Sequence, residues 1–152
     1  MPRPYRRPLQ RDWRIDAGDH AAAYRARREF ADELRKVRWQ NADYASAELI
    51  FGELVHNAVR HARSLVQVEL IIDASPRLLV RDDGPGFWFR EPTLAPPEAE
   101  RGRGLGIVRA VARGMHFERR GDASVVTVQL PLWLHCACKD VDFRGQPDAL
   151  RG

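Results

Sequence analysis

The stretch ELVHNAVRHA, residues 53–62, constrains the fold more than any other part of the chain. Its apolar residues recur with the period of a helix that packs on a core, yet Glu53, Asn57 and His61 follow one another at intervals of four. Residues at that spacing lie on one face of a helix. Because burying a polar group without a partner is costly, the stripe predicts a polar partner on its other side.

The hydrophobic periodicity around this stretch predicts helices first and strands afterwards. A short edge strand is expected at Trp13–Ile15, a first helix over residues 19–37 with Asp19 as its cap, and a second over residues 43–63 with Asp43 as its cap. Strands are then expected over residues 65–73 and 77–84, forming a hairpin, and over 115–120 and 124–131, with a helix over 104–114 between the two pairs. Residues 87–100 contain three prolines and predict a long loop.

This order of elements favours an α+β fold, a two-layer sandwich with a mixed, mostly antiparallel sheet and helices on one face. It lacks the alternating βα units of a Rossmann sheet. With 152 residues and 44% hydrophobic composition, one domain is expected over residues 13–131, between a basic arm, 1–12, and a tail, 132–152. No apolar stretch is long enough to span a bilayer and no secretory signal opens the chain, so a cytoplasmic protein is expected.

The charge balance favours a solvated basic arm over a nucleic-acid site. The formal net charge is +4, and the positive charge is almost entirely arginine, but no aromatic residues interleave with a basic stripe. Near the C-terminus, His135, Cys136 and Cys138 form a fragment of a metal site. Two thiols and one imidazole without a second cluster are a poor zinc site, and two cysteines this close fit a reducing compartment.

Two glycine-bearing stretches follow the polar helix. In VRDDGPGF, residues 80–87, Gly84 and Gly86 come directly after a strand that ends at Asp82, where the backbone can turn or approach a neighbour closely. In RGRGLGIVRAVA, residues 101–112, three glycines precede an apolar helix, and the free N–H groups of such a turn suit phosphate. It matches neither a Walker loop nor a dinucleotide fingerprint. Taken alone, each stretch also fits an ordinary turn.

In this order, the three stretches resemble the GHKL ATPases, the superfamily that contains gyrase, MutL, the histidine kinases and the anti-sigma-factor serine kinases. ELVHN is similar to the N box, DDGPG to the G1 box and GRGLG to the G2 box, and residues 88–100 fall where the family has its ATP lid. The resemblance covers residues 13–131 and implies the Bergerat-type ATP-binding fold.

The resemblance also implies a role for each matching residue. Asn57 would ligate Mg²⁺, Glu53 would face the γ-phosphate as general base, and Asp82 would accept a hydrogen bond from the adenine amino group. Gly84 and Gly86 would leave room for ATP. The phosphates would meet backbone N–H groups of four residues of the third stretch: Gly102, Gly104, Leu105 and Gly106. Arg103 either contacts a phosphate or is a solvated lid residue.

The sequence leaves the role of several further residues open. His61 lies near the nucleotide or serves as a structural histidine at the helix end. Ser124 stands near a position where the family often has threonine, while Ala123 stands where it often has glycine, so the role of Ser124 stays open. The simplest interpretation of four apolar residues is a place in the core: Leu49, Val55, Ile107 and Val108.

Within the superfamily, the chain is most similar to the small anti-sigma-factor serine/threonine kinases, which have a strand and helix before the N box, a compact lid and a G2 box similar to GRGLGIVRA. That resemblance implies phosphoryl transfer from ATP to a serine of a small STAS-type antagonist, control of a sigma factor by partner switching, and a homodimer. Trp13 is a candidate exposed aromatic for self-association. A non-catalytic, nucleotide-dependent binding module and a detached histidine-kinase catalytic domain remain the alternatives, although DHAAAYR around His20 does not resemble a phosphoacceptor box.

Overall fold

A computed structural model describes residues 9–84 and 100–134 of the chain, with backbone alone for residues 100–104. Within these ranges, no helix is both long enough and apolar enough to cross a bilayer. The elements, in chain order, are β1 (Leu9–Asp16), α1 (His20–Arg35), β2 (Trp39–Ala42), α2 (Tyr44–His61), β3 (Leu65–Ile72), β4 (Arg77–Asp82), α3 (Glu100–Val111), β5 (Gly114–Arg120), β6 (Ala123–Gln129) and β7 (Leu132–Leu134).

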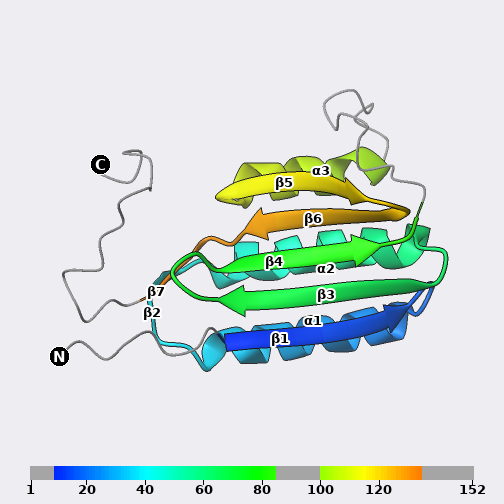
Figure 1. The fold of residues 1–152 in the computed structure, drawn as a ribbon. Coiled ribbons are helices and arrows are strands. Elements are labelled where there is room, and N and C mark those ends of the chain that lie inside the picture. The colour runs from blue at the N-terminus through cyan, green and yellow to red at the C-terminus, as the bar shows by residue number, and fades with distance from the viewer. Residues whose placement is uncertain (1–8, 85–99, 135–152) are drawn as a thin grey trace.

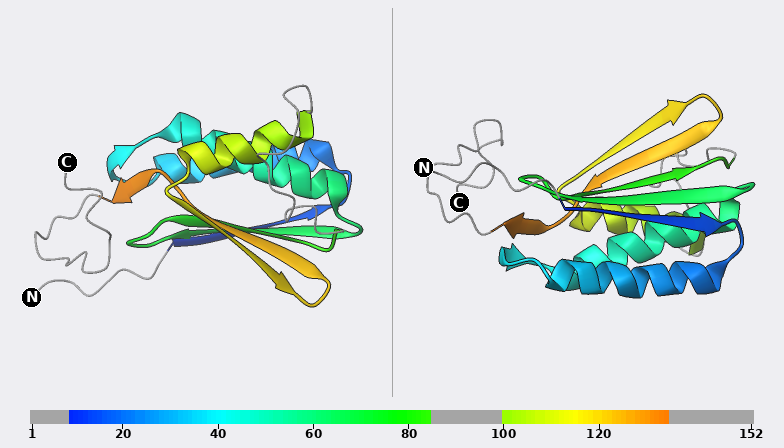
Figure 2. Two further views of the ribbon diagram at one scale, coloured as in Figure 1. Left: turned by 90° about the horizontal axis from the view of Figure 1, so that it is seen from above. Right: turned by 60° about the horizontal axis from the view of Figure 1, so that its bottom comes forward.

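The main sheet has five strands in the order β1-β3-β4-β6-β5 (Figure 1). Each neighbouring pair in it is antiparallel, and β2 and β7 form a separate two-stranded antiparallel ribbon. The three helices lie on one face of the main sheet, with α2 between α1 and α3 (Figure 2). The two-layer α+β prediction is therefore confirmed.

Both long helices begin at the residues that the sequence indicates. The Asp19 carboxylate accepts a hydrogen bond from the Ala22 N–H at 2.9 Å, and Asp43 accepts from the Ser46 N–H at 3.0 Å. These caps satisfy N–H groups that the first turn of a helix leaves free. The C-terminal ends come about two residues earlier than predicted, at Arg35 and His61, as is usual where terminal turns fray.

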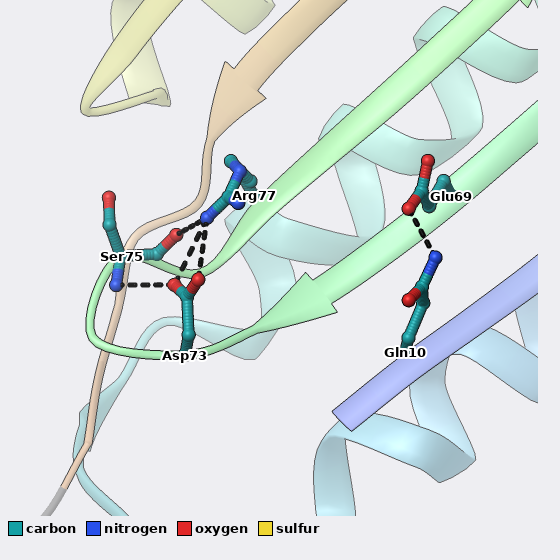
Figure 3. A network of polar contacts seen from close by, with 5 residues as sticks. All are labelled: Gln10, Glu69, Asp73, Ser75 and Arg77. Carbon is teal, nitrogen blue, oxygen red and sulfur yellow. Dashed lines mark hydrogen bonds and ion pairs between the residues drawn. The ribbon is translucent and has the colours of Figure 1, made fainter. Parts of the chain in front are cut away.

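The predicted β3–β4 hairpin is present, and its turn is held by one carboxylate (Figure 3). Asp73 accepts from the Ser75 N–H at 2.8 Å, and both of its oxygens accept from the Arg77 guanidinium, at 3.0 and 2.9 Å. An aspartate that bonds the backbone two residues on is a typical turn device. It fixes the register that brings Asp82 to the far end of β4.

The helix-facing side of the sheet forms the core. Trp13 packs edge-on against Phe51 with ring centroids 5.5 Å apart, and Phe30 stacks on Phe51 at 4.6 Å. Trp13 is only 7% exposed, and its indole N–H donates to Glu29 of α1 at 2.9 Å. Its suggested role as an exposed aromatic for self-association is therefore wrong, because α1 covers the inner side of β1.

Other expectations also need correction. Strand β1 begins at Leu9, so residues 9–12 of the predicted arm pair with β3, and β7 takes residues 132–134 from the predicted tail. The ribbon of β2 and β7 escaped prediction because strands this short carry no readable alternation. Val55 and Val108 are buried as predicted and Leu49 is half-buried, but Ile107 is 40% exposed, because it precedes Val108 on the helix and points about 100° away from it.

Candidate nucleotide-binding site

The polar stripe of α2 lies at the border between core and solvent. Leu54 and Ala58 are fully buried, whereas Glu53 and Asn57 are half-buried. Neither of these two polar side chains forms a hydrogen bond or ion pair with any residue that the structure describes. The polar groups of the stripe thus have no partner among the described residues, as the sequence indicated, and they are available to bind a ligand.

Asp82 lies at the end of β4 and is 0% exposed. Among the residues that the structure describes, it is the one buried acidic residue. It follows Val80 on the helix-facing side of the sheet, and its Oδ1 accepts from the Gly84 N–H at 2.7 Å. Ser124 stands opposite it in the β4–β6 register. The buried Ser124 Oγ has no hydrogen-bond partner among the described residues, which is unusual for a buried hydroxyl.

Gly84 sits where two backbone segments meet. A Cβ at this position would lie 2.7 Å from Asp82 Oδ1 and 2.7 Å from the carbonyl oxygen of His61. No side chain fits there, so the glycine is required by the close approach of the β4 end to the C-terminal end of α2. His61 ends α2 half-buried, and its carbonyl forms part of this contact.

Asp83 joins the same two ends, and sequence reasoning missed it. Its Oδ1 accepts from the backbone N–H groups of Arg63 at 2.8 Å and Ser64 at 3.1 Å, and its Oδ2 accepts from the Ser64 hydroxyl. The hydrogen bond from the Ser64 hydroxyl, followed by those from the backbone, lowers the pKa of Asp83 to about 2. The only available signal was its place between Asp82 and Gly84, where an aspartate often bonds nearby backbone.

The third glycine stretch differs from its prediction. Helix α3 begins at Glu100, so Gly102, Gly104 and Gly106 lie inside it and do not form a turn before it. Helical N–H groups beyond the first turn bond to carbonyls four residues earlier, so in this structure the N–H groups of Gly104, Leu105 and Gly106 do not point to a ligand. Each glycine costs a helix about 1 kcal/mol, but Leu105, 4% exposed, and the fully buried Val108 anchor α3 to the core.

Some of the remaining predicted site residues lie outside the residues that the structure describes. Gly86 and residues 88–99 of the predicted lid lie outside the described residues, and for Arg103 only the helical backbone is described. Gly106 is exposed, and a Cβ there would meet nothing within 4 Å. The cysteines 136 and 138 and His135 also lie outside the described ranges.

The fold gathers the three stretches at one end of the molecule. Helix α2 packs against α3 and against β3 and β4, and Figure 1 shows the end of β4, the C-terminal end of α2 and the start of α3 at the same end of the sheet. A cavity of about 420 Å³ borders Asp82 and Asp83, but it is also lined by Gln67 and Arg81, which alternate with the helix-facing residues, so it opens on the other side of the sheet from α2. A second cavity, of about 270 Å³, borders Glu53 but lies between α1 and α2, and neither Asn57 nor Asp82 lines it.

The donor set fits a nucleotide with magnesium. A buried carboxylate beside an unpartnered hydroxyl suits the polar edge of a purine base, and the Asn57 carboxamide supplies the kind of oxygen that Mg²⁺ prefers. Within residues 9–84 and 100–134, no group of three or more His, Cys, Asp or Glu is arranged to hold a metal. A magnesium ion here would therefore depend on Asn57, phosphate oxygens and water.

Comparison with protein families agrees with this geometry. Residues 17–130 match the histidine kinase-like ATPase domain, which spans most of the 152 residues. The chain belongs to this family and is an ATP-binding protein of the GHKL type. A comparison with curated proteins found no match.

Proposed function

We propose that this chain is an ATP-dependent protein serine/threonine kinase of the anti-sigma-factor type. It phosphorylates a small STAS-type antagonist and so regulates a sigma factor by partner switching. The observation that carries the proposal is the half-buried pair of Glu53 and Asn57, one helical turn apart and without partners among the described residues. The similarity of the GRGLGIVRA stretch to the G2 box of those kinases supports the subclass.

In this proposal, each side chain has a distinct task. Asp82 accepts a hydrogen bond from the adenine amino group, with the Ser124 hydroxyl beside it, and the Asn57 oxygen ligates magnesium. The metal, when bound, neutralises phosphate charge. Glu53 accepts the proton of the acceptor serine or threonine hydroxyl. The hydroxyl oxygen then bonds to the γ-phosphorus of ATP while the bond from that phosphorus to ADP breaks.

Replacing Glu53 by glutamine separates binding from chemistry. The amide keeps the size of the side chain but cannot take the proton, so phosphoryl transfer should fall by roughly a hundredfold or more. ATP affinity, measured by calorimetry, should stay near wild type and in the micromolar range, about −8 kcal/mol. Asn57→Ala is the matched variant, and it should instead remove most of the dependence of binding on magnesium.

The product distinguishes the three function classes. Labelled ATP and a candidate STAS protein should give an acid-stable phosphoserine or phosphothreonine. An acid-labile product would indicate a histidine kinase catalytic domain. ATP binding without any transfer, combined with a partner affinity that changes with nucleotide, would indicate a non-catalytic binding module. A wild-type chain that does not bind ATP would overturn all three.

The protein partners and the homodimer of the proposed kinase follow from the resemblance, and its setting follows from the composition of the chain. We expect a cytoplasmic homodimer that contacts the antagonist and the sigma factor, without nucleic acid or membrane. Sedimentation that finds only monomer at tens of micromolar would contradict the dimer.

A further inference from the structure

A cavity of about 270 Å³ lies in the seam between α1 and α2, and the GHKL roles leave it unassigned. Its polar border comprises His20, Tyr24 and Arg27 from α1, and Glu53 and His56 from α2. The imidazole rings of His20 and His56 face each other across the seam with centroids 5.0 Å apart. Tyr24 is 63% exposed although it is aromatic.

Arg27 enters this seam because α2 has a glycine opposite it. A Cβ on Gly52 would lie 3.0 Å from Arg27 Nη1 and 3.2 Å from its Cζ, so the guanidinium lies against the bare backbone of α2. A glycine inside a helix costs roughly 0.5–1 kcal/mol relative to alanine, and the three atoms nearest to this Cβ position all belong to the guanidinium of Arg27. Gly52 thus admits the guanidinium of Arg27.

The guanidinium of Arg27, an exposed residue, is not paired at the seam. Among the cations of α1, Arg35 pairs with Glu48, whereas Arg25 and Arg28 have no ion pair to a described residue. Arg27 has no ion pair to a described residue. Glu53 is the one carboxylate on the border of the cavity, and it lies on the side of α2 that also bears Asn57.

We propose that the α1–α2 seam is an oxyanion-binding site separate from the nucleotide site. Arg27 presents a planar fork of N–H donors, which suits carboxylate or phosphate, and the two imidazoles and the Tyr24 hydroxyl supply further donors. The anion is a free phosphate or a carboxylate of an acidic protein segment. Because the cavity also borders Glu53, occupancy of this site places charge and bulk beside the residue assigned as general base.

Histidine side-chain NMR on the full chain tests this site directly. Titration with inorganic phosphate, against chloride at equal ionic strength, should shift the imidazole signals of His20 and His56 with saturation at roughly millimolar concentration. His116, exposed on β5, should not respond and serves as the internal reference. A tetraglutamate peptide forms the second arm, and tighter binding of the peptide than of phosphate assigns the site to a protein carboxylate.

Paired variants identify the residues responsible. Arg27→Gln should weaken anion binding roughly tenfold or more, whereas Arg28→Gln, the exposed neighbour on α1, should have no effect. Gly52→Leu should cause the same loss by displacing the guanidinium, without lowering the unfolding temperature. Shifts that vanish when ATP saturates the protein would assign the anion to the nucleotide site and overturn the proposal. So would unresponsive His20 and His56, or wild-type binding by the Arg27 variant. ATP affinity, measured separately, shows whether the proposed kinase function fails independently.

Discussion

Asp83→Asn should weaken the junction between α2 and β4 on which the nucleotide site is built. The native carboxylate accepts three hydrogen bonds from Arg63 and Ser64. Hydrogen bonds to charged groups contribute about 1.5–3 kcal/mol and neutral ones about 0.5–1.5 kcal/mol. Because Asp83 is partly exposed and solvent screens its charge, the expected loss is about 1–2 kcal/mol in total. That corresponds to a fall in Tm of about 3–6 °C.

The pH dependence of this loss is the sharper test. The pKa of Asp83 is lowered from 3.8 to about 2 in the folded chain. A depressed pKa means that the carboxylate stabilises the fold at pH above its ordinary value and that this contribution disappears as pH falls toward the folded pKa. The Tm difference between wild type and variant should therefore be full at about pH 7 and shrink below about pH 4.

Thermal unfolding followed by circular dichroism across this range measures the effect. Asp32→Asn is the control, because Asp32 is exposed on α1 and has no ion pair or hydrogen bond to a described residue; its Tm should match wild type throughout. A Tm difference for the Asp83 variant that is absent at neutral pH, or that keeps its size at about pH 2.5, would refute the assigned junction.

Two glycine substitutions give opposite expectations. Gly84→Ala should lower stability by about 1–3 kcal/mol and also weaken ATP binding, because the new Cβ would overlap Asp82 Oδ1 and the His61 carbonyl; a variant with wild-type Tm would contradict that close approach. Gly106→Ala should raise stability by about 0.5–1 kcal/mol, because its Cβ meets nothing within 4 Å in α3. Calorimetry with ATP then tests its phosphate-binding role: weaker binding by this more stable variant indicates that the glycine leaves helical geometry when nucleotide binds, and unchanged affinity contradicts the role.

The sequence by itself determined the features that depend on neighbours along the chain. The caps at Asp19 and Asp43, the apolar faces of the helices and the β3–β4 hairpin follow from spacing of a few residues. Local hydrogen bonds and side-chain period fix these features before any tertiary contact forms. The polar stripe of Glu53 and Asn57 could be predicted from the sequence for the same reason, because residues one helical turn apart share a face of the helix.

Only the tertiary structure decided contacts between segments far apart in the chain. Asp83 meets Ser64 from about 20 positions away, Gly84 meets the His61 carbonyl, and Arg27 meets Gly52. Likewise, the glycines of the third stretch lie inside α3, the helix that the buried Leu105 and Val108 anchor to the core. No pattern along the chain predicts these contacts, because each depends on the tertiary packing of helices and strands. The sequence therefore supplied the chemical groups of the site, and packing determined which of them meet.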